Sequence, residues 1–95
     1  MAIYDPDTGA NNGQVSVGSS STSVLSTNRN RKFAILVNDS DEAIYVALGS
    51  TAVMNKGIRL NASGGNLIID EKYTGPVSAI CSSGSKVLTY CQNLV

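Results

Sequence analysis

The sequence contains no histidine and no tryptophan among its 95 residues. Histidine is the side chain most often used for proton transfer near neutral pH and for metal binding, so the commonest residue of both kinds of site is absent. Serines are plentiful, but none stands in a recognisable motif with a base. Gly64-Gly65 lacks the strand-to-helix context of a phosphate-binding loop. We therefore expect no catalytic residue, no cofactor and no metal, and the sequence predicts a protein that binds or builds rather than an enzyme.

Charge is scarce and balanced: seven Lys and Arg against seven Asp and Glu give a formal net charge of zero. Surfaces that bind nucleic acid are usually basic, so nucleic acid is not an expected partner. No apolar run approaches the roughly 18 residues of a membrane span, and residues 1–5 lack the features of a signal peptide. We therefore expect a protein made in the cytoplasm with no membrane partner. Zero net charge also suits self-association.

Short apolar segments separated by turn residues fill most of the chain. They lie at residues 33–37, 43–48, 57–60, 67–69, 77–81 and 87–91. Their spacing and their β-branched and aromatic side chains are typical of strands, and no segment has the pattern of a substantial amphipathic helix. The sequence predicts an all-β fold, a small β-sandwich or jelly-roll-like barrel of about seven or eight short strands. The second segment is expected to form a hairpin with the first, and the last two segments another.

Alternation along these strands predicts the hydrophobic core. Residues 33–37 are continuously apolar, which favours a central strand covered on both faces. A one-residue shift of register would turn every side chain of a strand to the opposite face, so the choice of register decides which residues are expected in the core. The expected core consists of Phe33, Ile35, Val37, Ile44, Val46, Leu48, Ile58, Leu60, Leu67, Ile69, Val77, Ala79, Val87 and either Thr89 or Leu88.

The two cysteines, Cys81 and Cys91, are expected to be free thiols. In a hairpin with a two-residue loop they would point to opposite faces. With a three-residue loop they would share a face but lie about 13 Å apart, at about 3.3 Å per residue, which is too far for a disulfide. Two distant cysteines also do not make a metal site.

The first 23 residues differ in composition from the rest. A polar, turn-forming stretch, one short alternating strand at residues 14–17 and a Ser-rich tract bury too little apolar area to order themselves. We therefore divide the chain into an N-terminal arm, residues 1–23, and a β-sandwich domain, residues 24–95. The apolar arm residues Ile3, Tyr4, Val15 and Val17 are expected to become ordered against a neighbouring subunit, with residues 14–17 adding a strand to an exposed sheet edge.

The charged motifs are two acidic clusters and one basic run. Asp5 and Asp7 begin a pattern similar to a calcium loop, but the later positions lack the required glycine and glutamate, so we interpret it as a solvated turn. Residues 39–42 place three carboxylates in an expected surface loop. The basic run before residue 33 includes Arg29 and Arg31, which we interpret as a solvated strand entry or as a contact for an acidic partner surface.

From residue 24 onward the sequence resembles the small β-rich virion structural proteins of tailed bacteriophages. The features that carry the resemblance are, in order, Asn30-Arg31-Lys32 leading into residues 33–38, Ser40-Asp41, Ile44-Tyr45-Val46, Gly57-Ile58-Arg59-Leu60, Gly64-Gly65 and residues 73–80. The resemblance covers about three quarters of the chain and brings no catalytic motif.

The resemblance implies a structural component of the virion: a capsid decoration (cement) protein, or a small tail or neck component. Its partners would be the major capsid protein or other virion proteins, together with further copies of itself as a dimer or trimer. A carbohydrate- or receptor-binding module on the same kind of β-sandwich is the alternative. Sugar binding usually exploits exposed aromatic rings, of which a chain with four tyrosines, one phenylalanine and no tryptophan has few.

Overall fold

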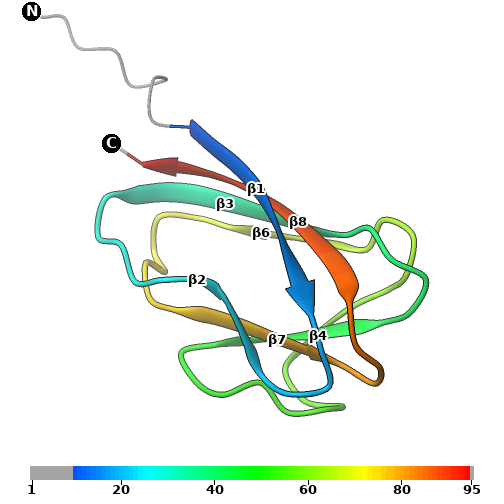
Figure 1. Ribbon diagram of the computed structural model, residues 1–95. Coiled ribbons are helices and arrows are strands. Elements are labelled where there is room, and N and C mark those ends of the chain that lie inside the picture. Colours follow the sequence, from blue (N-terminus) through cyan, green and yellow to red (C-terminus); the bar gives the residue numbers. More distant parts are fainter. Residues whose placement is uncertain (1–9, 95) are drawn as a thin grey trace, which may run out of the picture.

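The computed structural model describes residues 10–94 and consists of eight strands in two antiparallel sheets (Figure 1). Sheet A has the order β1-β8-β3-β6 and sheet B the order β2-β7-β4-β5. The strands are β1 (Ala10–Val17), β2 (Thr22–Leu25), β3 (Arg31–Asn38), β4 (Ile44–Leu48), β5 (Ile58–Leu60), β6 (Asn66–Ile69), β7 (Val77–Cys81) and β8 (Lys86–Leu94). Within residues 10–94 there is no helix, and so none that could cross a membrane. The predicted all-β sandwich is confirmed.

The pairing of the strands explains how one chain makes both sheets. β1 pairs with β8, β2 with β7, β3 with β6 and β4 with β5. The chain can therefore be described as one long antiparallel ribbon, in which β1 to β4 form one strand of the ribbon and β5 to β8 run back along it. The ribbon is rolled so that β8 also pairs with β3, and β7 with β4. This is the strand order of an eight-stranded jelly roll. Almost every connection therefore passes from one sheet to the other, and the two expected hairpins are wrong: β3 and β4 lie in different sheets, as do β7 and β8.

The core lies between the two sheets and uses the opposite face of β3 from the expected one. Ala34 and Leu36 are buried there, whereas Phe33, Ile35 and Val37 point away from the core and are half-buried. The expected core residues of β4 and β7 are buried, with the exception of Leu48, and in β8 the buried residue is Leu88. The buried hydrophobic residues are Val17, Val24, Leu25, Ala34, Leu36, Ile44, Val46, Ala52, Leu60, Ile69, Val77, Ala79, Ile80, Cys81 and Leu88.

This register makes a direct prediction about β3. Leu36→Ala should lower the free energy of unfolding by about 2–5 kcal/mol, because it leaves a cavity between the sheets. Ile35→Ala should lower it by less than Leu36→Ala does, because the partly buried Ile35 side chain loses only part of the roughly 1.5–3 kcal/mol of full burial. Urea denaturation of both variants measures the difference. A larger loss for Ile35→Ala than for Leu36→Ala would contradict the register.

Asn38 ends β3 from a buried position. Its amide nitrogen donates to the carbonyl oxygens of Glu42, at 2.8 Å, and Leu60, at 2.9 Å. Its side-chain oxygen accepts from the backbone nitrogen of Ser40 at 3.0 Å and from the Ser40 hydroxyl at 2.6 Å. The predicted turn after residue 37 is therefore closed by a side chain that also ties β3 to β5.

The first 23 residues do not form a separate arm over the part that is described. β1 pairs along its whole length with β8 of its own chain, and β2 pairs with β7. Val17 is 0% exposed and belongs to the core, against which Val15 is packed. The predicted strand at residues 14–17 exists, but the sheet edge that it completes is intramolecular. Residues 1–9 lie outside the described residues.

Candidate interaction surface

One face of the sandwich carries uncharged and partly apolar side chains: the side of sheet A that points away from the core, here called face A. Because side chains alternate along a strand, the strand residues whose neighbours are buried in the core point to this face. Face A consists of Asn12, Gln14 and Ser16 of β1, Val87, Thr89, Cys91 and Asn93 of β8, Phe33, Ile35 and Val37 of β3, and Asn66 and Ile68 of β6. No Lys, Arg, Asp or Glu is among them.

The apolar residues of face A form a connected stripe. The registers place Cys91 beside Ile35, and Ile35 beside Ile68 on the next strand. Ile68 is 68% exposed, the largest exposure among the large hydrophobic residues of the described chain. Single exposed apolar residues are ordinary, but a contiguous patch with a polar surround marks a contact surface.

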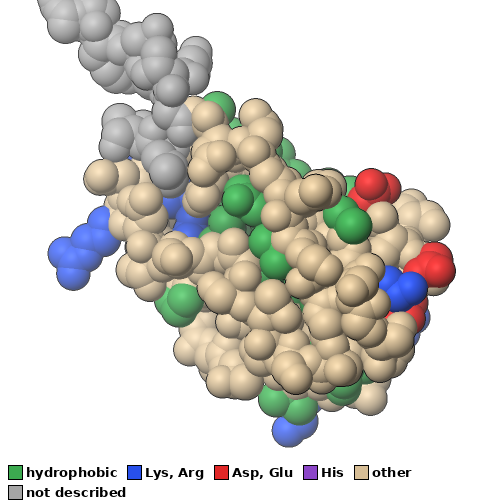
Figure 2. All heavy atoms as spheres, in the orientation of Figure 1, with side chains coloured by type: hydrophobic (Ala, Val, Ile, Leu, Met, Phe, Trp, Pro, Cys, Tyr) green, Lys and Arg blue, Asp and Glu red, His purple; other side chains and the backbone are tan. Residues whose placement is uncertain are grey.

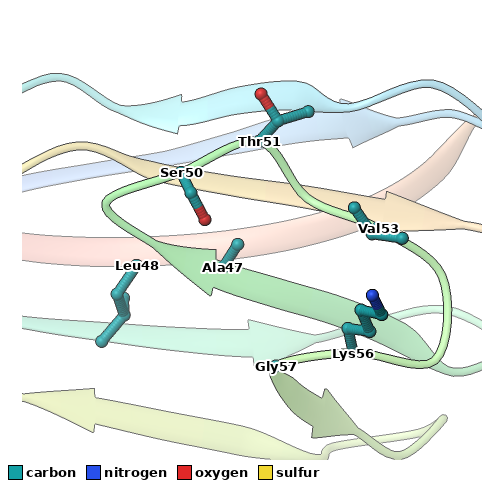
Figure 3. Close-up of a pocket in the computed structure, with 7 residues that line it drawn as sticks. All are labelled: Ala47, Leu48, Ser50, Thr51, Val53, Lys56 and Gly57. Atoms are coloured by element: carbon teal, nitrogen blue, oxygen red, sulfur yellow. The ribbon is translucent and has the colours of Figure 1, made fainter.

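The outer face of sheet B is different because the β4–β5 loop lies over it. The loop leaves β4, crosses β7 and reaches β2, where the backbone nitrogen of Ala52 donates to the Ser21 hydroxyl at 2.9 Å (Figure 3). Ala52 is buried by this crossing. The loop can return to β5 because Gly57 has a φ of +87°, and a Cβ at this position would clash with the carbonyl oxygen of Val46.

A cavity of about 240 Å³ lies between this loop and β4 (Figure 3). It is lined by Ala47, Leu48, Ser50, Thr51, Val53, Lys56 and Gly57. Lys56 is the one charged residue in this lining, and no aromatic ring or carboxylate faces it there. The cavity has no pair of groups that could transfer a proton or attack a substrate.

Two of the acidic residues after β3, Asp41 and Glu42, are occupied by structural contacts. Asp41 forms an ion pair with Lys86, with Oδ1 and Nζ 2.6 Å apart. Glu42 accepts hydrogen bonds from the backbone nitrogens of Ser82 and Ser83, at 3.1 and 3.0 Å, and from both of their hydroxyls. The Ser83 backbone and hydroxyl and the Ser82 hydroxyl lower the pKa of Glu42 from 4.5 to about 2. Among the described residues no three His, Cys, Asp or Glu side chains could hold a metal ion.

The Glu42 contacts predict a pH dependence of stability. A carboxyl group whose pKa falls on folding stabilises the fold above its unfolded value, and this stabilisation is lost as the pH falls through the folded value. Glu42→Gln should therefore lower the melting temperature at pH 7. The difference from the parent protein should shrink between about pH 4.5 and about pH 2. Melting curves over this range measure it, with the exposed Glu71→Gln as control, and a pH-independent difference would contradict the assignment.

The structure separates the residues that the sequence predicted for partner binding. Val17 and Arg31 are both in the interior, with Arg31 1% exposed, so neither can contact a partner and both predictions are corrected. Arg29 is exposed in the β2–β3 loop and stays a prediction. Ile3 and Tyr4, like the calcium-loop-like residues, lie outside the described residues.

Arg31 is held by oxygens of its own chain. The guanidinium group donates to the carbonyl oxygens of Ser26 at 2.8 Å, Gly75 at 3.2 Å and Tyr73 at 3.3 Å. Its Nε lies 3.4 Å from the side-chain oxygen of Gln92. Burial lowers the pKa of Arg31, although the nearby Tyr73 opposes this shift. The group joins two loops and β8, which is a structural role that the basic run in the sequence did not indicate.

Both thiols are free, as predicted, but their places differ from the expected hairpin. Cys81 is buried in sheet B, with Sγ 2.6 Å from the carbonyl oxygen of Ser83. Burial raises the pKa of the Cys81 thiol. Cys91 is half-buried in sheet A and belongs to face A. No disulfide joins them, because Cys81 points into the core and Cys91 points away from it on face A.

Sequence reasoning missed face A because its central residues were assigned to the core. The available signal was the unbroken apolar run of residues 33–37, which has apolar side chains on both faces of the strand. Comparison with protein families, with curated proteins and with solved structures finds no match to this chain.

Proposed function

We propose that this protein is a non-enzymatic structural component of a tailed-bacteriophage virion, specifically a capsid decoration (cement) protein that binds and stabilises the head shell. The observation that carries the proposal is face A, an uncharged and partly apolar surface on a small jelly roll. The sequence resemblance from residue 24 onward supports the same assignment. Such a protein works through contact surfaces, and its partners are the major capsid protein, other virion proteins and further copies of itself.

The physical requirements of such a role agree with the structure. A subunit that stabilises a shell must hold its contact surface rigid, because each side chain that becomes ordered on binding costs about 0.5–1.5 kcal/mol. In face A the contact residues are on paired strands, with β8 in register with β1 on one side and β3 on the other. The surface is therefore already ordered before it meets a partner.

Mass spectrometry of purified phage particles, with copy number per virion, tests the proposal. Hundreds of copies per particle are expected for a decoration protein. About a dozen copies or fewer would assign the protein to the tail or neck, which is the second form of the proposal. Absence of the protein from purified particles would overturn both.

Carbohydrate binding is not favoured by the one cavity described above. Sugar rings usually stack on exposed aromatic side chains, and none lines the cavity under the β4–β5 loop. We therefore do not propose a glycan-binding module as a second function.

A further inference from the structure

We propose that face A is a self-association surface, on which a second copy of this chain packs across a twofold axis that lies in the interface perpendicular to the strands. The inference rests on the proposed function in one respect: it identifies a further copy of the chain as the partner that binds face A. It concerns the isolated protein, so it can be tested without the particle.

The absence of charge on face A favours a second copy as the partner. In a twofold contact each residue meets the same surface patch on the other copy, so a charged residue near the axis would face its own like charge. None of the residues assigned to face A is charged, while the exposed Lys32, Asp39 and Asp70 stand at the ends of β3 and β6. A surface made to bind a charged partner would carry the complementary charge at its centre.

The rim charges select the orientation. Lys32 is exposed at the beginning of β3, and Asp39 is exposed directly after its end. In the view of Figure 2, acidic side chains gather at the end of the sandwich where β3 finishes, with basic atoms beside them, and a basic side chain projects from the opposite end. An axis perpendicular to the strands reverses β3 on the second copy, so Lys32 of one copy lies near Asp39 of the other. An axis parallel to the strands would bring like ends together.

The size of face A predicts a weak dimer. β1, β8 and β3 are eight or nine residues long and β6 has four, which at about 4.8 Å between strands and about 3.3 Å per residue gives a surface of roughly 450 Å². Pairing two such surfaces would bury about 900 Å² in total, less than the roughly 1,200 Å² at which stable specific interfaces begin. Two outer sheet faces can pack at about 10 Å, as aligned sheets do inside a sandwich. We expect a dissociation constant on the order of 10–100 µM.

Sedimentation equilibrium of the purified protein tests self-association. The parent protein should dimerise, and Ile68→Lys should weaken the dimer at least tenfold, because it places two like charges in the interface. Ile68 is 68% exposed, so the substitution should leave the melting temperature of the monomer unchanged. Val53→Lys is the matched control, since Val53 is 47% exposed but lies in the β4–β5 loop, and it should dimerise like the parent.

Cys91 supplies a second measurement with a native residue. Face A contains Cys91 but not Cys81, which is buried. The rate of Cys91 alkylation should therefore fall as protein concentration rises, and Ile68→Lys should restore the rate of the monomer. A rate that does not depend on concentration in a protein shown to dimerise would place the interface elsewhere and overturn the proposal.

A charge exchange tests the orientation. Lys32→Glu and Asp39→Lys should each weaken the dimer, and the double variant should recover the parent affinity. The two residues lie at opposite ends of β3, about 23 Å apart at 3.3 Å per residue, so recovery cannot arise within one chain. Failure of the double variant to recover would overturn the perpendicular axis.

Two further outcomes separate this inference from the proposed function. A parent protein that stays monomeric at about 1 mM would overturn self-association, since this is ten times the weakest expected dissociation constant. If that monomer still binds particles, and Ile68→Lys abolishes the binding, face A contacts another virion protein and the proposed function survives. Dimerisation of a protein that is absent from particles would support the inference and overturn the proposed function.

Discussion

Replacing Arg31 with methionine should lower the free energy of unfolding by about 3–5 kcal/mol. Methionine fills much of the same volume but donates no hydrogen bond, so the carbonyl oxygens of Ser26, Tyr73 and Gly75 lose their donor. These hydrogen bonds are partly buried, and each acceptor that loses its donor there costs about 1–3 kcal/mol. A domain of this size is stable by roughly 5–14 kcal/mol, so the loss is a large part of the total.

Arg31→Lys should be nearly as damaging. An ammonium group is a compact charge that cannot reproduce the planar fork of donors, although it keeps the positive charge. Thermal melts measure both variants, and a loss of 3 kcal/mol should lower the melting temperature by more than about 12 °C in a domain this small. Arg29→Met is the control, because Arg29 is exposed and should change stability by less than about 0.5 kcal/mol. A parent-like melting temperature for Arg31→Met would show that the guanidinium contacts do not hold the loops.

The fold class could be predicted from the sequence because it depends on local patterns. Short apolar segments and turn residues alternate along the chain, and the structure has a strand at each of the expected positions. The connections could not be predicted in the same way. A short polar loop can close a hairpin or lead to the opposite sheet, and what decides between them is the pairing of distant segments such as β1 with β8.

The register of β3 shows why the candidate surface was missed. Residues 33–37 are apolar on both faces, so alternation alone does not say which face is buried. The structure buries the smaller Ala34 together with Leu36, on the same face of β3 as the buried polar residue Asn38. Asn38 resembled an exposed turn residue in the sequence, because its buried acceptors on Glu42 and Leu60 come from segments that only the fold brings together. With the register reversed, the larger side chains form face A.

The same distinction between local and distant contacts explains the first strand. Residues 10–23 are polar and rich in Ser and Gly, and nothing nearby in the sequence could hold them. Their partners are β8 and β7, which lie more than 50 residues away. A segment that looks too polar to order itself can therefore be an integral strand when the rest of the sheet already presents an edge.

Val17→Asp tests whether the first strand is an integral part of the fold. Val17 is 0% exposed and contributes to the core. The substitution loses roughly 1.5–3 kcal/mol of apolar burial. It also buries a polar group without a hydrogen-bond partner, which costs about 1–3 kcal/mol more. We therefore expect a loss of about 3–6 kcal/mol, seen as a large drop in the melting temperature.

Ser19→Asp provides the matched control for Val17→Asp. It introduces the same side chain two residues later, at an exposed position outside face A, and should change stability by less than about 0.5 kcal/mol. If residues up to 23 formed an arm that is ordered only by a neighbouring subunit, both variants of the isolated domain would melt like the parent. Melting temperatures equal to that of the parent for both variants would therefore indicate that β1 is an assembly arm. A large loss for Val17→Asp alone makes β1 part of the sandwich, and makes its outward residues Asn12, Gln14 and Ser16 a fixed border of face A.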